Sequence, residues 1–299
     1  MRLSEISSRL QATMVRDAEF LNLGFFFDNL PGKLIFVVAR RFVSAARKVP
    51  GVKCILCTPE LASSFPDVEG LATAAEPQLA FFHLQRFLVE ETDFYGAPFP
   101  ADIHSSVRIH PRASIATRNV RVGPDTIVEA NVTIGEGSLI GAGVHVRAGA
   151  VLGAEGFQTA RYPGGMLQMV HGGGLSVQDN VEIFANAVIA KSVFRQMTTL
   201  GEHSRIGNGA FVSHNVQLGK RCFVGHNSTI NGNTVVGDDV WIGPNATIGN
   251  LLRIGDRSRI SLGAAVIQSV PANAHVTGMI AIDHWRMLRH VASIPASAR

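Results

Sequence analysis

Three histidines in the second half of the chain, His203, His214 and His226, are the residues best suited to chemistry. An imidazole with an ordinary pKa of about 6.5 can accept a proton from an amine or a hydroxyl at neutral pH. The sequence contains no Walker loop, no nucleophile elbow, no HExxH pair and no paired CxxC zinc signature. The residue types therefore favour general-base catalysis over phosphoryl transfer, serine hydrolysis or a structural zinc site, and we expect no metal.

Two of the three cysteines, Cys54 and Cys57, form a single CxxC pair. They lie in an apolar segment that ends before Pro59, and short apolar segments of this kind are typical of buried strands. We therefore expect a structural role for both thiols rather than a redox site.

A six-residue repeat positions the histidines. From residue 200 onward every sixth residue is Ile, Leu or Val, and the same spacing runs through residues 103–152 and 177–189 with one extra residue near 116–121. This period fits neither a helix nor a long half-buried strand. It fits short strands joined by turns, in which each strand sends one aliphatic side chain inward and Gly or Asn supplies the turn. Three hexads close one triangular coil, so the sequence predicts a mainly β fold, a parallel β-helix. The anchors of the unbroken run are Leu200, Ile206, Val212, Leu218, Val224, Ile230, Val236, Ile242, Ile248, Ile254, Ile260 and Val266.

The repeat brings one histidine beneath one glycine. Gly232 follows His214 by eighteen residues, which is one full coil, so we expect the two residues to be stacked. A glycine there leaves room for a ligand, and its N–H can stabilise an oxyanion while His214 accepts a proton. This pair makes acyl transfer mechanically plausible.

The repeat also divides the chain. Residues 1–101 lack it and read as a small α/β domain, with strands expected over 33–38 and 52–57 and a helix over 78–89. The β-helix is expected over 102–270, and a short helical tail over 271–299. Residues 153–174 and 190–199 interrupt the hexads. Such interruptions often form ligand-binding loops at one edge, although a simple tolerated insertion is equally compatible with the pattern.

Composition narrows the class of protein and its partners. Among 299 residues, 46% are apolar and only 17% are charged, which excludes a disordered chain and favours self-association. The flat sides of a solenoid offer surfaces for this, and we expect a homotrimer. The formal charge of +4, without a dense basic run and with two Trp and two Tyr, disfavours nucleic-acid binding. No apolar stretch reaches the roughly 18 residues of a membrane span, and the first residues lack a signal-peptide core, so a cytoplasmic protein without a transmembrane segment is expected.

Several motifs together resemble the UDP-3-O-acylglucosamine N-acyltransferases of lipid A biosynthesis, which belong to the hexapeptide-repeat acyltransferases. The resemblance extends over nearly the whole chain and is most specific at Val212-Ser-His-Asn-Val-Gln-Leu-Gly. It also includes Gly153-Ala-Glu-Gly-Phe, His171-Gly-Gly-Gly-Leu and the tail Gly278-Met-Ile-Ala-Ile-Asp-His-Trp-Arg.

The resemblance implies a left-handed β-helix, a homotrimer with active sites between subunits, and no tightly bound cofactor. It implies an acyl thioester on acyl carrier protein as co-substrate, with coenzyme A as the alternative donor, and a nucleotide sugar as acceptor. It makes His214 the general base and Gly232 the oxyanion-hole residue. The remaining residues that it implies bind substrate are Asn208, Asn215, Phe36, Phe42 and His171.

This chain also departs from the family's pattern. Ala39 and Phe42 stand where the family usually has Asn and Tyr near the base, Ile189-Ala-Lys-Ser replaces Ile-Asp-Arg-Gly, and Leu251 replaces a second histidine. Three functions therefore stay open. The first is N-acylation of a nucleotide-linked amino sugar, with UDP-3-O-acylglucosamine as the best match. The second is acylation of another nucleotide amino sugar from acyl-CoA for a surface polysaccharide. The third is a non-catalytic trimeric scaffold that binds a sugar nucleotide.

Overall fold

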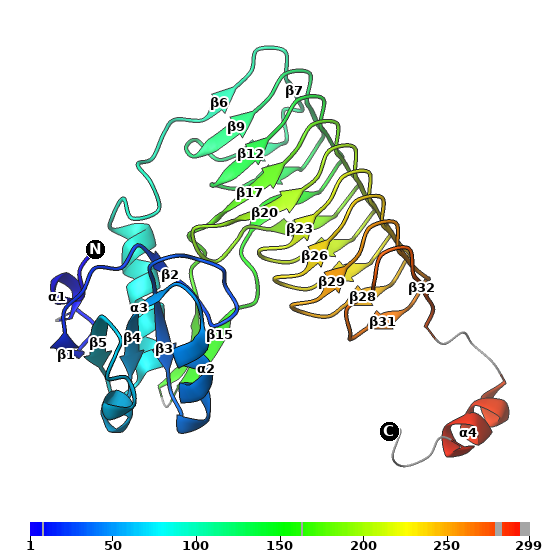
Figure 1. The fold of residues 1–299 in the computed structure, drawn as a ribbon. Coiled ribbons are helices and arrows are strands. Elements are labelled where there is room, and N and C mark those ends of the chain that lie inside the picture. The colour runs from blue at the N-terminus through cyan, green and yellow to red at the C-terminus, as the bar shows by residue number, and fades with distance from the viewer. Residues whose placement is uncertain (8, 163, 279–282, 294–299) are drawn as a thin grey trace.

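The structure, a computed structural model, describes residues 1–7, 9–162, 164–278 and 283–293. A small α/β domain at the N-terminus lies beside a long β-helix, and a helix follows the last coil (Figure 1). The α/β domain contacts the side of the β-helix from which the first interruption of the hexad repeat projects.

The N-terminal domain is built on a five-stranded sheet in the order β1-β5-β4-β3-β2. Strands β2 to β5 pair in parallel and β1 pairs antiparallel with β5. The predicted strands appear as β3 and β4, and Cys54 and Cys57 are buried in β4 with free thiols. The elements are α1 (Leu3–Ile6), β1 (Thr13–Arg16), β2 (Asn22–Leu23), β3 (Lys33–Val37), the 3-10 segment Arg40–Phe42, α2 (Val43–Lys48), β4 (Val52–Cys57), the 3-10 segment Pro59–Ser64, β5 (Gly70–Thr73) and α3 (Pro77–Glu90).

The rest of the fold is a parallel β-helix of three sheets, here named A, B and C, that the chain visits in that order once per coil. Sheet A contains β6 (Asp102–Ile103), β9 (Val120–Val122), β12 (Ser138–Ile140), β17 (Gly174–Val177), β20 (Met197–Leu200), β23 (Gln217–Leu218), β26 (Val235–Val236) and β29 (Arg253–Ile254). Sheet B contains β7 (Arg108–Ile109), β10 (Ile127–Val128), β13 (His145–Val146), β18 (Glu182–Ile183), β21 (Arg205–Ile206), β24 (Phe223–Val224), β27 (Trp241–Ile242), β30 (Arg259–Ile260) and β32 (His275–Val276). Sheet C contains β8 (Ser114–Ile115), β11 (Thr133–Ile134), β14 (Val151–Ala154), β19 (Val188–Ala190), β22 (Phe211–Val212), β25 (Thr229–Ile230), β28 (Thr247–Ile248) and β31 (Ala265–Val266).

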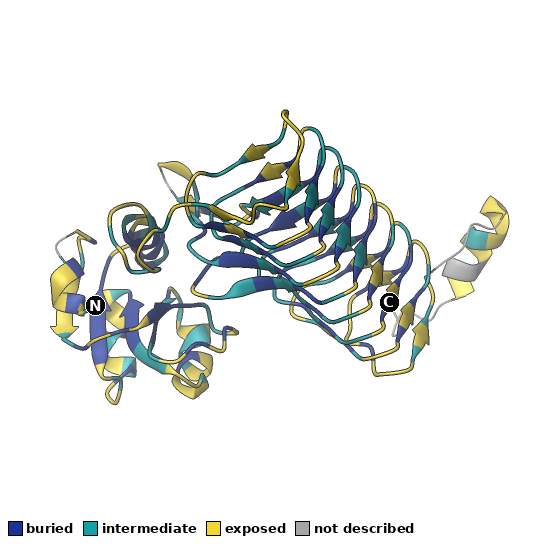
Figure 2. Ribbon diagram, turned by 90° about the horizontal axis from the view of Figure 1, so that it is seen from above, coloured by how far each residue is buried: buried dark blue, intermediate teal, exposed yellow. Residues whose placement is uncertain are grey.

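The hexad anchors form the core of this β-helix, as the repeat predicts. Val212 pairs in parallel register with Ile230, which pairs with Ile248, so each coil from β20 onward repeats after eighteen residues. The anchors from Val122 onward are buried, whereas Ile103 and Ile109 in the first coil are exposed. Residues on either side of the buried anchors are more exposed, which gives the alternating bands of Figure 2. The third residue after an anchor has a positive φ at corner after corner, as at Asn215 (φ 56°) and Asn233 (φ 60°). Asn tolerates this left-handed conformation better than most residues, which explains its recurrence.

The two interruptions of the repeat attach the N-terminal domain to the β-helix. The first contains a hairpin of β15 (Thr159–Tyr162) and β16 (Gly165–Gln168). Phe194, from the second, packs edge-on against Phe25 with ring centroids 4.9 Å apart. The Gln85 amide donates hydrogen bonds to the carbonyls of Val170 and Val193. These segments share one apolar core with the α/β domain, so they fix that domain against the coils.

The coils continue beyond residue 270 to β32, and α4 (His284–Ser293) follows. The tail predicted at 271–299 includes residues 279–282 and 294–299, which lie outside the described residues. Over the described residues, every helix is too short or too polar to cross a bilayer.

Candidate functional site

His214 and Gly232 meet at the corner where the chain passes from sheet C to sheet A, here called the C–A corner. His214 follows β22 by two residues, and Gly232 follows β25 by two residues in the next coil. A Cβ atom built on Gly232 would lie 2.5 Å from His214 Nε2. Any residue with a Cβ atom at position 232 would displace the imidazole. The eighteen-residue spacing brings the pair together as expected.

The Gly232 amide has no hydrogen-bond partner among the described residues, although its neighbours do. Asn231 N–H donates to Ile248 O at 3.0 Å, and Asn233 N–H donates to His214 O at 3.0 Å. Gly232 itself is buried beside the imidazole. An unpaired backbone donor beside a potential base is the arrangement that an oxyanion hole requires.

The His214 ring is enclosed on its other edge by three residues. Ser213 Oγ lies 3.2 Å from Nδ1, a Cβ on Gly156 would lie 3.0 Å from the same atom, and His171 packs edge-on with ring centroids 5.8 Å apart. Burial, with a smaller effect of His171, lowers the pKa of His214 to about 4. The expectation of an ordinary pKa near 6.5 is therefore wrong, because the imidazole is largely removed from water. His214 is therefore neutral at pH 7, and the same burial makes it a weaker base than an imidazole in water.

His171 comes from the end of the first interruption and is fully buried. Its Nδ1 lies 3.1 Å from Lys191 O and 3.4 Å from Gly156 N, and its backbone N–H donates to Glu155 Oε1 at 3.2 Å. Its Nε2 is buried without a hydrogen-bond partner in the described structure. Burial lowers the pKa of His171, so this imidazole is neutral as well.

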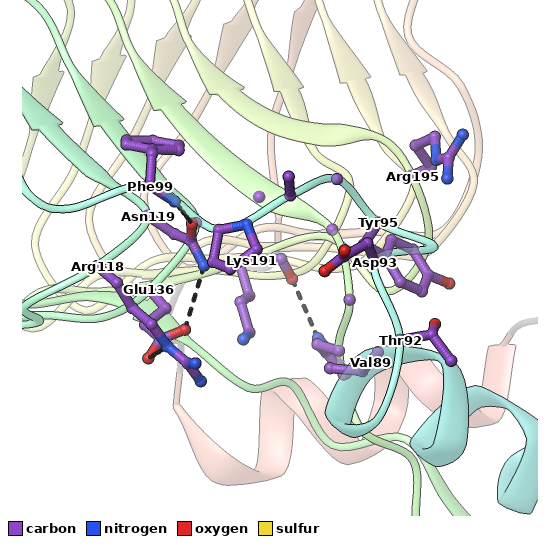
Figure 3. Close-up of a pocket in the computed structure, with 18 of the residues that line it drawn as sticks. Val89, Thr92, Asp93, Tyr95, Phe99, Arg118, Asn119, Glu136, Lys191 and Arg195 are labelled. Atoms are coloured by element: carbon purple, nitrogen blue, oxygen red, sulfur yellow. Dashed lines mark hydrogen bonds and ion pairs between the residues drawn. The ribbon is translucent and has the colours of Figure 1, made fainter.

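A cavity of about 740 Å³ opens beside His171. Its walls are the linker after α3, residues 89–99, and the coil residues 118–119, 136–139, 171–174 and 191–197. Figure 3 shows the Lys191 side chain extending into it, between Arg118 and Glu136 on one side and Tyr95 and Arg195 on the other. Burial lowers the pKa of Lys191, which Glu155 and Glu136 partly oppose.

Sequence reasoning missed Lys191 as a site residue. Lys191 follows the anchor Ile189 by two residues, as His214 follows Val212 and Gly232 follows Ile230. These three residues therefore occupy one column of the C–A corner in successive coils. The second interruption lengthens this coil, so the eighteen-residue spacing does not point to Lys191, and the signal for it was its position two residues after the anchor Ile189.

A second, smaller pocket of about 200 Å³ lies in the N-terminal domain. Phe36 lines it together with Phe25, Phe26 and Gln158, the last from the first interruption. Phe42 is absent from its lining and stacks on Phe26, with ring centroids 6.0 Å apart and planes 28° apart. Phe36 therefore lines an aromatic pocket, whereas Phe42 packs against the lining residue Phe26 and is not itself part of the lining.

The structure separates Asn208 from His214. One hexad is one side of the triangle, so Asn208 lies at the preceding corner, between sheets B and C, where its N–H donates to His226 Nδ1 at 2.9 Å. His226 therefore has a structural use as a cap. His203 is an exposed turn residue with φ 61°. Asn215 is next to His214, but its amide donates to Asn233 Oδ1 at 2.8 Å, which ties it into the turn.

Within the described ranges, no three side chains of His, Cys, Asp or Glu gather so as to hold a metal ion. The chemistry available to the C–A corner is that of its neutral imidazole, its unpaired amide and the nearby cavity.

Comparison with known proteins agrees with the repeat. The family described as bacterial transferase hexapeptide (six repeats) matches residues 118–148 and 197–232, the second of which runs from β20 to Gly232. Both matched segments lie within the β-helix, where the anchors recur every sixth residue. Among curated proteins, the chain is 32% identical over 143 residues to UDP-3-O-acylglucosamine N-acyltransferase of Caulobacter sp. (strain K31), covering 48% of this chain and 42% of the relative. The enzyme of the same name from Rhizobium johnstonii is 41% identical over 64 residues, covering 21% of this chain and 18% of the relative. The matches thus span less than half the length of these relatives.

Solved structures resemble the chain in fold. UDP-N-acetylglucosamine acyltransferase of Francisella novicida has a TM-score of 0.50 and 20% identity, over 65% of this chain and 75% of that one. The Campylobacter jejuni UDP-N-acetylglucosamine acyltransferase has a TM-score of 0.50 and 17% identity, over 66% and 77%. At these identities the likeness concerns the β-helix alone.

Proposed function

We propose that this protein is an acyltransferase that moves an acyl group from an acyl thioester to the amine of a nucleotide-linked amino sugar. The observation that carries the proposal is the C–A corner, where the neutral His214 imidazole lies against Gly232 and the Gly232 N–H is unpaired. The names of the matching relatives support the substrate class, and UDP-3-O-acylglucosamine is the acceptor that they favour.

In the proposed reaction, the amine nitrogen of the sugar attacks the thioester carbonyl carbon and forms the C–N bond. The carbonyl electrons move to oxygen, and the Gly232 N–H stabilises the resulting oxyanion. The nitrogen loses its proton to His214 Nε2, while Nδ1–H donates to Ser213 Oγ and keeps Nε2 free to accept. Collapse of the intermediate re-forms the C=O bond and breaks the C–S bond, and His214 returns the proton to the departing thiolate.

The substrate would lie along the seam between the N-terminal domain and the coils. The chain segment Gly156–Gln158 connects the two ends of this path, since a Cβ built on Gly156 would lie 3.0 Å from His214 Nδ1 and Gln158 lines the aromatic pocket. We therefore assign the base of the nucleotide to the pocket of Phe36, with the reacting sugar at His214. Asn208 would contribute to the site only from a neighbouring subunit, which agrees with the expected homotrimer.

The test is turnover by the purified protein. UDP-linked glucosamine derivatives with a free amine are incubated with acyl carrier protein thioesters and, separately, with CoA thioesters of the same acyl group. Mass spectrometry of the sugar product should show an added acyl group, and the preferred donor separates a carrier-dependent enzyme from a CoA-dependent one. Absence of product with every pair would contradict the proposal and favour the scaffold hypothesis.

A further inference from the structure

Two charged side chains of the N-terminal domain are buried. Lys33, the first residue of β3, has no exposed surface, and Asp28 is only 5% exposed. Side chains of these types are rarely buried to this extent, because removing a charge from water is costly. The proposed reaction uses neither of them, so their burial requires another explanation.

Both side chains close the segment of residues 24–28, which contains no helix or strand. The Asp28 carboxylate accepts a hydrogen bond from the Phe25 N–H at 2.6 Å, and the Lys33 ammonium donates to the Asp28 carbonyl. The aliphatic part of Lys33 passes close to Gly24, where a Cβ would lie 3.0 Å from Lys33 Cδ. Polar contacts of two buried charges therefore hold this segment in place.

The same segment forms half of the aromatic pocket. Four of the eight residues that line the pocket come from it, namely Gly24, Phe25, Phe26 and Phe27. The Phe25 ring packs edge-on against Phe36, with ring centroids 6.2 Å apart, and against Phe194 of the second interruption. The contacts of Asp28 and Lys33 therefore determine where the rings of the pocket lie.

We propose that Asp28 and Lys33 are positioning residues for the base of the nucleotide. The inference rests on the proposed function, from which it takes the assignment of the base to this pocket. Neither side chain lines the pocket, so both act through Phe25 and its neighbours. A base stacks only on rings that are correctly placed, and a segment that must become ordered on binding lowers the affinity.

The first experiment is calorimetric titration of the full chain with UDP at pH 7.5. Burial raises the pKa of Asp28 to about 6, so its carboxylate is ionised at this pH. Asp28→Ala removes the acceptor of the Phe25 N–H and should weaken binding by about tenfold or more, the loss expected for a hydrogen bond to a charged group. Asp28→Asn keeps an oxygen in the same place and should bind UDP within about threefold of the wild type.

Lys33→Met tests the second contact, because it keeps the aliphatic stem and removes the ammonium. It should also weaken UDP binding by about tenfold. Lys53→Met is the matched control. Lys53 lies in the neighbouring strand β4 and forms a partly exposed ion pair with Glu69 at 3.3 Å, so this variant should bind as the wild type does.

Hydrogen exchange measured by mass spectrometry separates a local effect from a global one. In Asp28→Ala, the peptide that contains residues 24–28 should exchange faster, while β4 stays as protected as in the wild type. In the turnover assay the same variant should raise KM for the nucleotide sugar by about tenfold and leave kcat within about twofold. Equally faster exchange in both segments would assign the two charges to the stability of the domain and overturn the positioning role.

The titrations distinguish this inference from the proposed function. Absence of UDP binding by the wild type would contradict the assignment of the base to this pocket, and the positioning role would be lost with it. Undiminished binding by Asp28→Ala, or an equal loss in Asp28→Ala and Asp28→Asn, would overturn the positioning role alone and leave the proposed function in place.

Discussion

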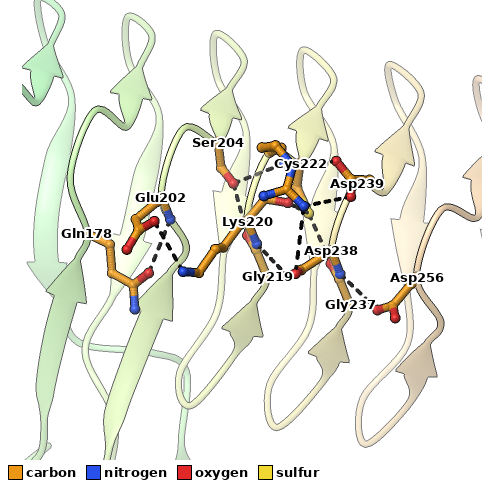
Figure 4. Close-up of polar contacts among 11 residues, drawn as sticks. Gln178, Glu202, Ser204, Gly219, Lys220, Cys222, Gly237, Asp238, Asp239 and Asp256 are labelled. Atoms are coloured by element: carbon orange, nitrogen blue, oxygen red, sulfur yellow. Dashed lines mark hydrogen bonds and ion pairs between the residues drawn. The ribbon is translucent and has the colours of Figure 1, made fainter.

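Two corners of the β-helix differ in whether the backbone amide of the second residue after an anchor is hydrogen-bonded. At the corner between sheets A and B, the second residue after an anchor has its N–H capped by an Asp of the next coil: Lys220 N–H donates to Asp238 Oδ1 at 2.8 Å, and Asp238 N–H donates to Asp256 Oδ1 at 3.0 Å (Figure 4). At the C–A corner the equivalent amide, that of Gly232, has no hydrogen-bond partner in the part of the chain that the structure describes.

The difference shows that the fold itself does not require the open amide. At the corner between sheets A and B, polar side chains hydrogen-bond to backbone groups. Further contacts along the same edge come from Cys222, Ser204 and the Arg221–Asp239 ion pair (Figure 4). The other corner places a histidine under an uncapped amide and beside a cavity. We propose that the reaction centre lies where this capping pattern is omitted.

Filling the space at Gly232 should have the largest effect. In Gly232→Ala the new methyl group would overlap the His214 ring, because the ideal Cβ position is only 2.5 Å from Nε2. The substitution would therefore displace the imidazole. We expect acyl transfer to fall by about 100-fold or more, the magnitude associated with losing an oxyanion-hole interaction. Steady-state kinetics provides the measurement.

Gly249→Ala is the control for that substitution. Gly249 lies in the next coil, and its nearest neighbour would be Val266 O at 3.2 Å from the added Cβ, a contact that the backbone can accommodate. It should keep most of the activity. Equal activity in the two variants would contradict the proposed role of Gly232.

Copying the cap of the A–B corner into the C–A corner should have the next largest effect. Asn250 stands one coil above Gly232, in the place that Asp238 takes above Lys220. Asn250→Asp should put a carboxylate over the Gly232 amide, so it competes with the oxyanion and repels it. We expect about a tenfold loss in kcat and a melting temperature that is unchanged or slightly higher. An undiminished kcat would show that the open amide is not used.

Removing a cap from the A–B corner should change stability and not activity. Asp238→Ala leaves the Lys220 N–H unpaired at a partly exposed turn, which we expect to lower the free energy of unfolding by about 1 kcal/mol. Urea denaturation measures this, and kcat should stay within error of the wild type. Loss of activity without loss of stability would mean that this corner also takes part in the reaction.

The smallest predicted effect is that of pH near neutrality. The pKa of His214 is lowered to about 4, so the fraction of neutral base is constant from pH 8 to pH 6. With an acceptor whose amine is already deprotonated in that range, kcat/KM should be flat and then fall as pH drops below about 5, when His214 becomes protonated. An acid limb centred near 6.5 would show that substrate binding or a neighbouring subunit restores water or charge around the imidazole.

The β-helix and the His214–Gly232 pair could be predicted because a strict period converts sequence distance into spatial distance. From β20 onward eighteen residues mean one coil, so no knowledge of loops was needed for this pair. The cavity, His171 and the depressed pKa of His214 could not be derived in this way. They depend on how the interruptions at 153–174 and 190–199 fold back onto the N-terminal domain, and those segments carry no period.

The same reasoning explains why two of the expected substrate-binding residues lie away from His214 and from the pocket of Phe36 within one protomer. Asn208 is one hexad from His214 and therefore lies at another corner, because one hexad is one side of the triangular coil. Residues that are close in sequence are therefore not close in space here. Phe42 follows β3 closely in sequence, yet it stacks behind Phe26 rather than lining the pocket of Phe36, because the 3-10 segment Arg40–Phe42 redirects the chain.

The most direct test of the open corner is the acyl-transfer rate of His214→Ala compared with His203→Asn. Both substitutions remove one histidine from the same β-helix, but His203 is an exposed turn residue with φ 61°, a conformation that Asn accommodates. With the donor and acceptor pair found for the wild type, His214→Ala should lose activity by about 100-fold or more while keeping its circular dichroism, and His203→Asn should keep its rate. Wild-type turnover in His214→Ala would remove the imidazole from the reaction.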